Sequence, residues 1–226
     1  MLWCNDLLRR HARDRWCVVV DPDEFLVYPY METRDLRALT QFLEDDQRPC
    51  MHALVIDAYS DRPLSETVLD ASADPFEVCP YFDREGYVQE ESWGNSTWVR
   101  GGPRMRAHFP DRPNESPALN KIPLIRWKPY YHYRQSMHDA YPRRLNRAHA
   151  EGEVSLTGAL FHFKLVASLK EKAAEEAERG EHYAGGREYA RYRTIEPKFF
   201  TEGISTRYTD SRQLIELGLI SPARWF

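Results

Sequence analysis

Three carboxylates stand close together near the N-terminus, in the stretch Asp21-Pro22-Asp23-Glu24. Two aspartates separated by one residue can hold a hard cation, because Mg²⁺ or Mn²⁺ is usually bound by one or two carboxylates together with substrate phosphates and water. Clustered carboxylates repel one another, so they favour a cation or arginines nearby. The alternatives are a solvated polar turn, and a structural Glu24 whose carboxylate accepts a hydrogen bond from a backbone amide.

Basic side chains farther along the chain could serve the same site. Arg104 and Arg106 follow the glycine pair at 101–102, and their alternation would place both on one face of a strand. Glycines let a backbone approach a ligand closely, and the planar guanidinium group suits phosphate. Lys121 directly precedes an apolar strand. The alternative for all three is a Gly-Pro turn with solvated cations around it.

Two histidines are further candidates. His138 follows Ser136 in a segment typical of a loop, and His162 lies between Phe161 and Phe163. A histidine flanked by two phenylalanines is often a hydrogen-bonded part of the core. A neutral imidazole at position 162 could equally be a third ligand of a metal ion at the acidic turn.

The acidic turn follows a continuous apolar run, 16–20, which predicts a strand buried on both faces. Pro22 cannot continue a strand, so the acids are expected where the chain leaves the sheet, which is where open α/β sheets bind ligands. A buried strand needs a neighbour on each side, and the chain before Trp16 is too short to supply one. Downstream strands must therefore complete the sheet, or the sequence is a fragment.

Periodicity and turn residues predict the other elements. Helices are expected over 1–13, over 33–45 with Thr33 as N-cap, over 165–179 and over 212–217. Strands are expected over 51–59, 105–109, 122–127 and 155–164, and a hairpin over 81–88 with its turn near Glu85. The segment 61–80, rich in Asp, Ser and Pro, is expected to run over the surface.

Composition excludes several classes of protein. A chain of 226 residues suits one α/β domain, and a net charge of −4 gives no general case for binding nucleic acid or acidic membranes. No apolar stretch is long enough to span a bilayer, and 1–14 lacks the apolar part of a signal peptide, so a soluble cytoplasmic protein is expected. Four cysteines without metal-type spacing are expected as reduced thiols: Cys4, Cys17, Cys50 and Cys79.

Five stretches resemble, in this order, a bacterial branch of the family 2-like glycosyltransferases. They are WCVVVDPDEFLVYP, GGPRMR, ALNKIPLIRW, Ser136-x-His138 and TGALFHFK, and the likeness runs from about Trp16 to Lys172. It implies a GT-A-like α/β fold over 1–180, with a mostly parallel mixed sheet flanked by helices, and a C-terminal helical appendage over 181–226. Such domains carry an N-terminal nucleotide-recognising half before the acidic motif. Only fifteen residues precede Trp16 here, so the domain is expected to be N-terminally truncated.

The resemblance implies metal-dependent transfer of a sugar from a nucleotide-sugar donor to a saccharide or another hydroxyl acceptor. Asp21 would lie near the ribose and sugar of the donor, and Asp23 would bind Mn²⁺ or Mg²⁺. The expected metal ligands are Asp21, Asp23 and His162. The residues expected to bind the donor and its diphosphate are Asp21, Arg104, Arg106, Lys121 and His138.

Catalysis needs groups beyond the metal site. Asp23 is expected to act in catalysis through the metal, which would act as a Lewis acid on the leaving group. An inverting transferase also needs a carboxylate as general base toward the acceptor hydroxyl. Glu90, Glu91 and Asp139 are the candidates, and the sequence does not rank them firmly.

Two other functions stay open. One is a truncated glycosyltransferase remnant that only binds a partner or an acceptor. The other is a metal-dependent phosphohydrolase built on Asp21 and Asp23. Phosphatases of the aspartyl-phosphate type carry Thr or Val shortly after the second aspartate, where Phe25 and Leu26 stand here, so this function is disfavoured.

Overall fold

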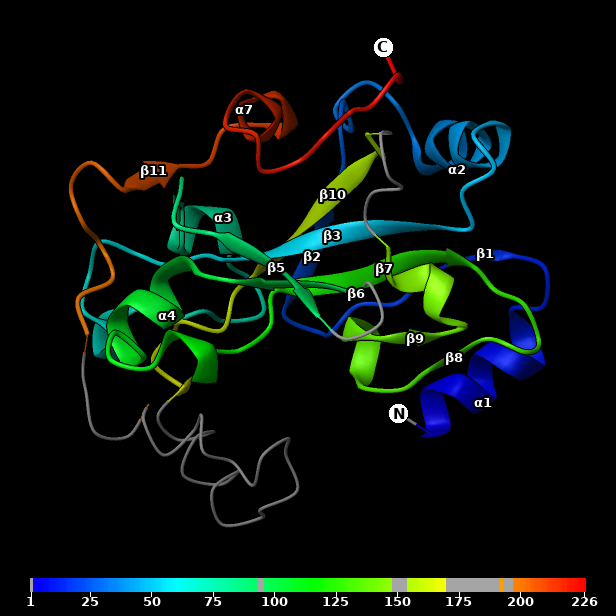
Figure 1. The fold of residues 1–226 in the computed structure, drawn as a ribbon. Coiled ribbons are helices and arrows are strands. Elements are labelled where there is room, and N and C mark those ends of the chain that lie inside the picture. The colour runs from blue at the N-terminus through cyan, green and yellow to red at the C-terminus, as the bar shows by residue number, and fades with distance from the viewer. Residues whose placement is uncertain (1, 93–95, 148–153, 170–191, 193–196) are drawn as a thin grey trace.

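The computed structural model describes residues 2–92, 96–147, 154–169, 192 and 197–226. Its centre is a five-stranded sheet in the order β1-β7-β3-β10-β2 (Figure 1). These strands are β1 (Trp16–Val18), β7 (Asn120–Arg126), β3 (Cys50–Asp57), β10 (Thr157–His162) and β2 (Glu24–Val27). The fold is therefore α/β, with a curled mixed sheet.

The expectation of a mostly parallel sheet is wrong. Only β3 and β10 run parallel, and the other three neighbouring pairs are antiparallel. Parallel neighbours need a crossover connection that returns the chain to the same end of the sheet. Strand β7 instead runs opposite to both of its neighbours, β1 and β3. The expectation that the strand before the acidic turn is buried on both faces is also wrong. Strand β1 lies at one edge of the sheet, and its side chains are half-buried or exposed.

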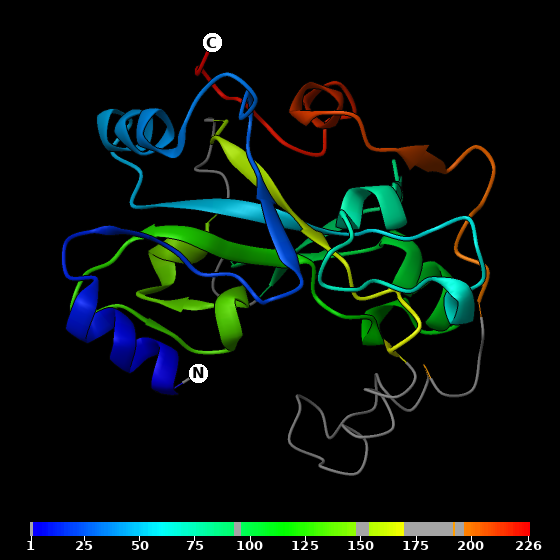
Figure 2. The same ribbon diagram turned by 180° about the vertical axis from the view of Figure 1, so that it is seen from behind.

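Helices cover both faces of the sheet (Figures 1 and 2). Helices α2 (Leu36–Asp45), α3 (Pro75–Val78) and α7 (Ser211–Glu216) lie on one side, and α1 (Leu2–His11) and α4 (Gly102–His108) lie on the other. Helix α2 buries Leu39 and Leu43, which are four residues apart and so share one face. Its N-cap is Asp35 instead of the expected Thr33, because the Asp35 carboxylate accepts the Ala38 amide.

Two local predictions are wrong for physical reasons. The expected strand 105–109 lies largely in helix α4, which begins after Gly101 and carries Pro103 in its first turn. The expected hairpin 81–88 does not form, because β4 (Tyr81–Asp83) pairs with the distant β11 (Ser205–Arg207). The remaining strands pair as β5 (Val88–Ser92) with β6 (Ser96–Arg100), and β8 (His132–Tyr133) with β9 (Ala140–Tyr141). Short 3₁₀ turns occur at Leu64–Glu66, Pro113–Glu115, Ser136–His138 and Arg143–Asn146.

The described part of the C-terminal segment, 197–226, packs on the same core as the sheet. Leu214 and Ile220 belong to a buried cluster with Val27 and Phe161, and Trp225 packs in a second cluster under α2. Helix α7 and the residues after it therefore pack on the sheet's own core, while β11 pairs with β4 in a separate sheet. The expected helix 165–179 and the expected boundary at residue 180 fall largely or wholly within 170–191, outside the described residues. None of the described helices is long and apolar enough to cross a membrane.

Gly101 should be irreplaceable in this fold. Its φ of 145° and ψ of −155° lie in a region open only to glycine, and a Cβ there would lie 2.3 Å from the Gly86 carbonyl oxygen. We expect Gly101→Ala to lower the free energy of unfolding by about 3 kcal/mol or more, from backbone strain plus the clash. Urea titration measures this loss.

Gly203→Ala is the matched control. Gly203 also has a positive φ, of 85°, but a Cβ there meets nothing within 4 Å, so only backbone strain of about 1–2 kcal/mol is expected. Equal losses in the two variants would contradict the clash.

Candidate functional site

The acidic turn crosses one end of the sheet from edge to edge. Strands β1 and β2 are the two edges, and the turn between them passes the start of β7 and the ends of β3 and β10. This path brings Asp21 to Lys121, the second residue of β7, and Asp23 to His162, the last residue of β10. Residues from distant parts of the chain thus meet at this end of the sheet.

Lys121 forms ion pairs with two carboxylates of the acidic turn, Asp21 and Glu24. Its Nζ lies 2.6 Å from Asp21 Oδ2 and 2.6 Å from Glu24 Oε1. The Lys121 and Glu24 side chains are 6% and 1% exposed, whereas that of Asp21 is 50% exposed. The other oxygen of Glu24 accepts the backbone N–H of Asp21 at 3.1 Å. This bond is the structural alternative considered for Glu24, and it is confirmed.

Asp57 organises the second half of the site. It is the last residue of β3 and the register partner of His162 in the parallel pair of β3 with β10. Its Oδ1 lies 2.8 Å from His162 Nδ1, and its Oδ2 accepts a hydrogen bond from Arg104 Nε at 2.6 Å. With Nδ1 bonded to a carboxylate, the other ring nitrogen, Nε2, lies 3.5 Å from Asp23 Oδ2.

These contacts shift the pKa values of the buried groups. Burial alone would raise the pKa of Asp57, but the Arg104 charge and the His162 hydrogen bond outweigh it and lower the pKa to about 2. Burial would also raise the pKa of Asp23. Its contact with His162 outweighs burial and lowers that pKa well below the usual range of an aspartate. The pKa of His162 is raised, because hydrogen bonds to Asp23 and Asp57 outweigh the burial that would lower it. Both carboxylates are therefore ionised at neutral pH.

The cluster carries more negative than permanent positive charge. Its four carboxylates, from Asp21, Asp23, Glu24 and Asp57, are paired with Lys121 and Arg104, and the charge of a third permanent cation, Lys164, also acts on Asp23. A proton on His162 offsets part of the remaining charge. A divalent cation beside a neutral His162 would likewise offset the remaining negative charge.

The three expected metal ligands are not gathered around one point. Within the described ranges, no three His, Cys, Asp or Glu side chains are placed to hold a metal ion together. Asp21 is turned toward Lys121, while Asp23 and His162 face one another. A cation at this place would take Asp23 and His162 from the chain and its other ligands from outside it.

The two arginines expected on one strand face point to different partners. About 200° separates positions 104 and 106 around a helix, so only Arg104 reaches the cluster. Arg106 instead makes two hydrogen bonds to Asp83, at 3.1 and 2.9 Å, and others to Thr201 and the Phe199 carbonyl. Arg106 thereby ties α4 to β4 and to the C-terminal segment.

His138 lies beside the cluster as a neutral imidazole. Its Nδ1 is 2.7 Å from the carbonyl oxygen of Asn120, the residue before Lys121. A carbonyl only accepts, so Nδ1 carries the proton and Nε2 is left as an acceptor. Burial and the neighbouring Lys121 charge lower the pKa of His138 to about 4.

The candidate general bases lie in other contacts. Asp139 pairs with Arg134 at 2.7 Å, and Glu90 pairs with Arg100 at 2.9 Å. Glu91 occupies β5 opposite Thr97, and its side chain is outside what the structure describes. The described contacts place neither Asp139 nor Glu90 within the charged cluster.

Sequence reasoning missed two residues of this site. Asp57 ends a buried strand, but its place beside His162 depends on the pairing of β3 with β10, for which the sequence carries no signal. Tyr87 is the other: its buried hydroxyl has no hydrogen-bond partner within the described ranges. Burial raises the pKa of Tyr87 well above its ordinary value, and the charges of Asp83 and Asp57 raise it further. A hydroxyl held neutral near Asp57 is available to donate to a ligand.

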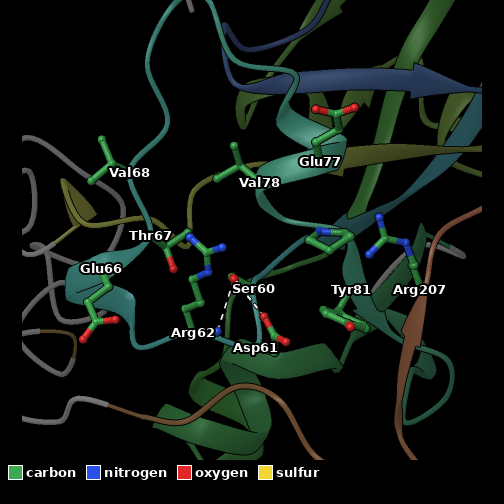
Figure 3. A pocket seen from close by; sticks show the side chains of 11 residues that line it. Ser60, Asp61, Arg62, Glu66, Thr67, Val68, Glu77, Val78, Tyr81 and Arg207 are labelled. Carbon is green, nitrogen blue, oxygen red and sulfur yellow. Dashed lines mark hydrogen bonds between the residues drawn. The ribbon is translucent and has the colours of Figure 1, made fainter.

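A separate pocket of about 370 Å³ shares no residue with this cluster. It lies between the loop after β3, helix α3 and strand β11, and Arg62 and Arg207 line opposite sides of it (Figure 3). Its other lining residues include the hydroxyls of Ser60 and Thr67. Its lining also includes the acidic side chains of Asp61, Glu66 and Glu77, so the arginines do not make it an anion site. The convergent charges lie in the cluster instead.

No protein-family model, curated protein or solved structure matches the chain. The geometry of the charged cluster and the five ordered stretches are therefore the features that bear on function. The glycosyltransferase resemblance stays a prediction.

Lys121 should be essential for stability, because it compensates a buried carboxylate. We expect Lys121→Met to lower the free energy of unfolding by about 3–5 kcal/mol, since Glu24 would be left buried without its cation. Adding Glu24→Gln should recover part of the loss. Urea titration gives the free energy of unfolding of the unchanged chain, of Lys121→Met and of the double variant.

Lys128→Met is the matched control. Lys128 pairs with Asp14 at the surface, so its loss should have a far smaller effect. Similar losses for the two lysine variants would show that Glu24 does not depend on Lys121.

The ionised form of Asp57 should make stability depend on pH in acid. Its folded pKa of about 2 lies below the unfolded value of about 3.9, so ionised Asp57 stabilises the fold above about pH 4. That contribution is lost as the pH falls from about 4 toward 2. Urea titrations at a series of pH values should give a shallower acid decline for Asp57→Asn than for the unchanged chain. Parallel curves would contradict the assignment.

Proposed function

We propose that this chain is a metal-dependent glycosyltransferase domain, or its C-terminal part, which transfers a sugar from a nucleotide donor to a hydroxyl acceptor. The observation that carries the proposal is the alignment of Asp57, His162 and Asp23 at the end of the sheet. Three of the five stretches that resemble glycosyltransferases supply Asp23, Lys121 and His162 to this cluster. A fourth stretch supplies Arg104.

The pair of Asp57 and His162 fits a metal ligand with its supporting carboxylate. Metal-binding histidines usually donate the N–H of one ring nitrogen to a carboxylate, which orients the other nitrogen toward the metal. Asp57 accepts from Nδ1, and Nε2 faces the Asp23 carboxylate. Asp23 and His162 would hold Mn²⁺ or Mg²⁺, and a bound cation would stabilise the negative charge of the departing diphosphate.

Two protein ligands are sufficient for a cation that arrives with its substrate. Mg²⁺ is commonly bound through one or two carboxylates together with substrate phosphates and water. This explains how a donor diphosphate could complete a site that the described side chains do not complete alone. Asp21 would then act on the ribose or sugar of the donor, through its exposed carboxylate.

Fixed cations and neutral groups around the metal position would orient the donor. The Lys121 ammonium is held by Glu24 and Asp21, so it is placed before any ligand binds. The Tyr87 hydroxyl can donate a hydrogen bond and His138 Nε2 can accept one. For the acceptor base, Glu91 and Asp139 remain the candidates, and Asp139 would have to leave Arg134.

One observation favours a second candidate function, that of a binding module without catalysis. The charged groups of the cluster already have partners within the chain: Lys121 holds Asp21 and Glu24, and Asp57 holds Arg104 and His162. Such a network is stable without a ligand. Turnover of nucleotide sugars in the presence of Mn²⁺ would exclude this alternative.

Asp23→Ala should abolish metal-dependent binding of a donor nucleotide and leave the fold intact. Asp23 lies in a turn at the sheet end, and its removal takes away one of two protein ligands. Calorimetric titration with UDP, with and without Mn²⁺, measures the effect. The unchanged chain should bind UDP more tightly with Mn²⁺, and the variant should show no difference between the two conditions.

Asp111→Ala is the control, because Asp111 is an exposed aspartate outside the cluster. It should bind UDP with Mn²⁺ as the unchanged chain does. Undiminished Mn²⁺-dependent binding by Asp23→Ala would contradict the assigned metal position. Absence of Mn²⁺-dependent binding in the unchanged chain would contradict the proposed function itself.

A further inference from the structure

Strand β1 leaves one side of its backbone open. The carbonyl of Arg15 accepts the amide of Trp127 at 2.9 Å, and the amide of Val19 donates to Pro123 at 2.8 Å, so the odd-numbered residues bond to β7. Backbone groups alternate in direction along a strand. Trp16, Val18 and Val20 therefore direct their N–H and C=O groups away from β7, where no strand of the described part pairs with them.

This open edge lacks two of the usual protections against pairing, charge and proline, although β1 itself is short, at three residues. Edge strands are normally shielded by charges, proline or a bulge, and the run 16–20 contains no charge and no proline. Val18 and Val20 are also 43% and 39% exposed. An unpaired backbone beside exposed β-branched side chains is a ready template for another strand.

The charges that flank β1 indicate that the other strand comes from a second copy of the chain. Antiparallel pairing centred on Val18 would place Trp16 opposite Val20, and Arg15 opposite Asp21 of the second copy. The next residues outward, Asp14 and Pro22, lie in turns on either side of this run. Arg15 directly before the run 16–20 and Asp21 directly after it thus complement each other under a two-fold rotation.

We propose that the open edge of β1 pairs antiparallel with the same edge of a second copy, around a two-fold axis at Val18. The pairing joins the two sheets into one continuous sheet. It places Arg15 of each copy beside Asp21 of the other, whose carboxylate is half exposed and otherwise bonded to Lys121. The second copy thereby supplies a cation at the rim of the acidic turn. This inference does not depend on the proposed sugar transfer.

The first test is the mass of the protein in solution. Sedimentation equilibrium over a range of concentrations should show a dimer of the unchanged chain. Val18→Lys should weaken the dimer by about tenfold or more, because it sets like charges opposite one another and removes an apolar contact. Val68→Lys is the matched control, since Val68 is 65% exposed and belongs to another segment. It should leave the dimer unchanged.

The second test is specific for the register. If Val18 faces its own counterpart, Val18→Lys and Val18→Glu should each be weakened alone, and an equimolar mixture should restore a heterodimer through the opposite charges. Circular dichroism of each variant checks that it is folded. A monomeric unchanged chain, a Val18→Lys dimer as tight as the unchanged one, or a mixture without heterodimer would each overturn the proposal.

Discussion

The buried carboxylate of Asp57 is the interaction on which this end of the molecule depends. It joins the central strand β3 to β10 through His162 and to α4 through Arg104. A buried charge costs free energy unless it is paired and hydrogen-bonded, and here both carboxylate oxygens have cationic or imidazole partners. The parallel register of β3 and β10 sets Asp57 beside His162, so the backbone ladder determines the geometry of the charged cluster.

The charged cluster contains one histidine, His162, whose charge depends on whether its imidazole carries a second proton. Burial would lower the pKa of His162, but its hydrogen bonds to Asp23 and Asp57 outweigh burial and raise that pKa, which favours the protonated imidazole. A divalent cation bound at Nε2, as in the proposed function, would compete with a proton for that nitrogen, so its binding would release a proton. Lys121, by contrast, is held by two carboxylates whether or not a cation binds. Lys121 is thus a permanent cation of the site, whereas the charge of His162 depends on its proton.

Local patterns predicted the elements that depend on local physics. The strands that became β3, β7 and β10 are apolar runs, and α2 has its leucines four residues apart. The alternation around Arg104 and Arg106 indicated a strand, but the turn at Gly101 and Pro103 starts a helix. Asp57 and the edge position of β1 escaped prediction, because both depend on which strands become neighbours. The residues of a single stretch do not determine which strands will lie beside it in the sheet.

The path of the acidic turn limits the shape of the whole sheet. Four strand spacings would separate the edges of a flat sheet by about 19 Å. The connection from Val18 to Glu24 ends in a tight turn, with the Glu24 amide bonded to the Asp21 carbonyl, so it reaches only about 17 Å. The sheet must therefore curl to let its two edges be joined, as it does in Figures 1 and 2. Sheets also twist by themselves, so the short acidic turn is compatible with this curvature and keeps its carboxylates at one end of the sheet.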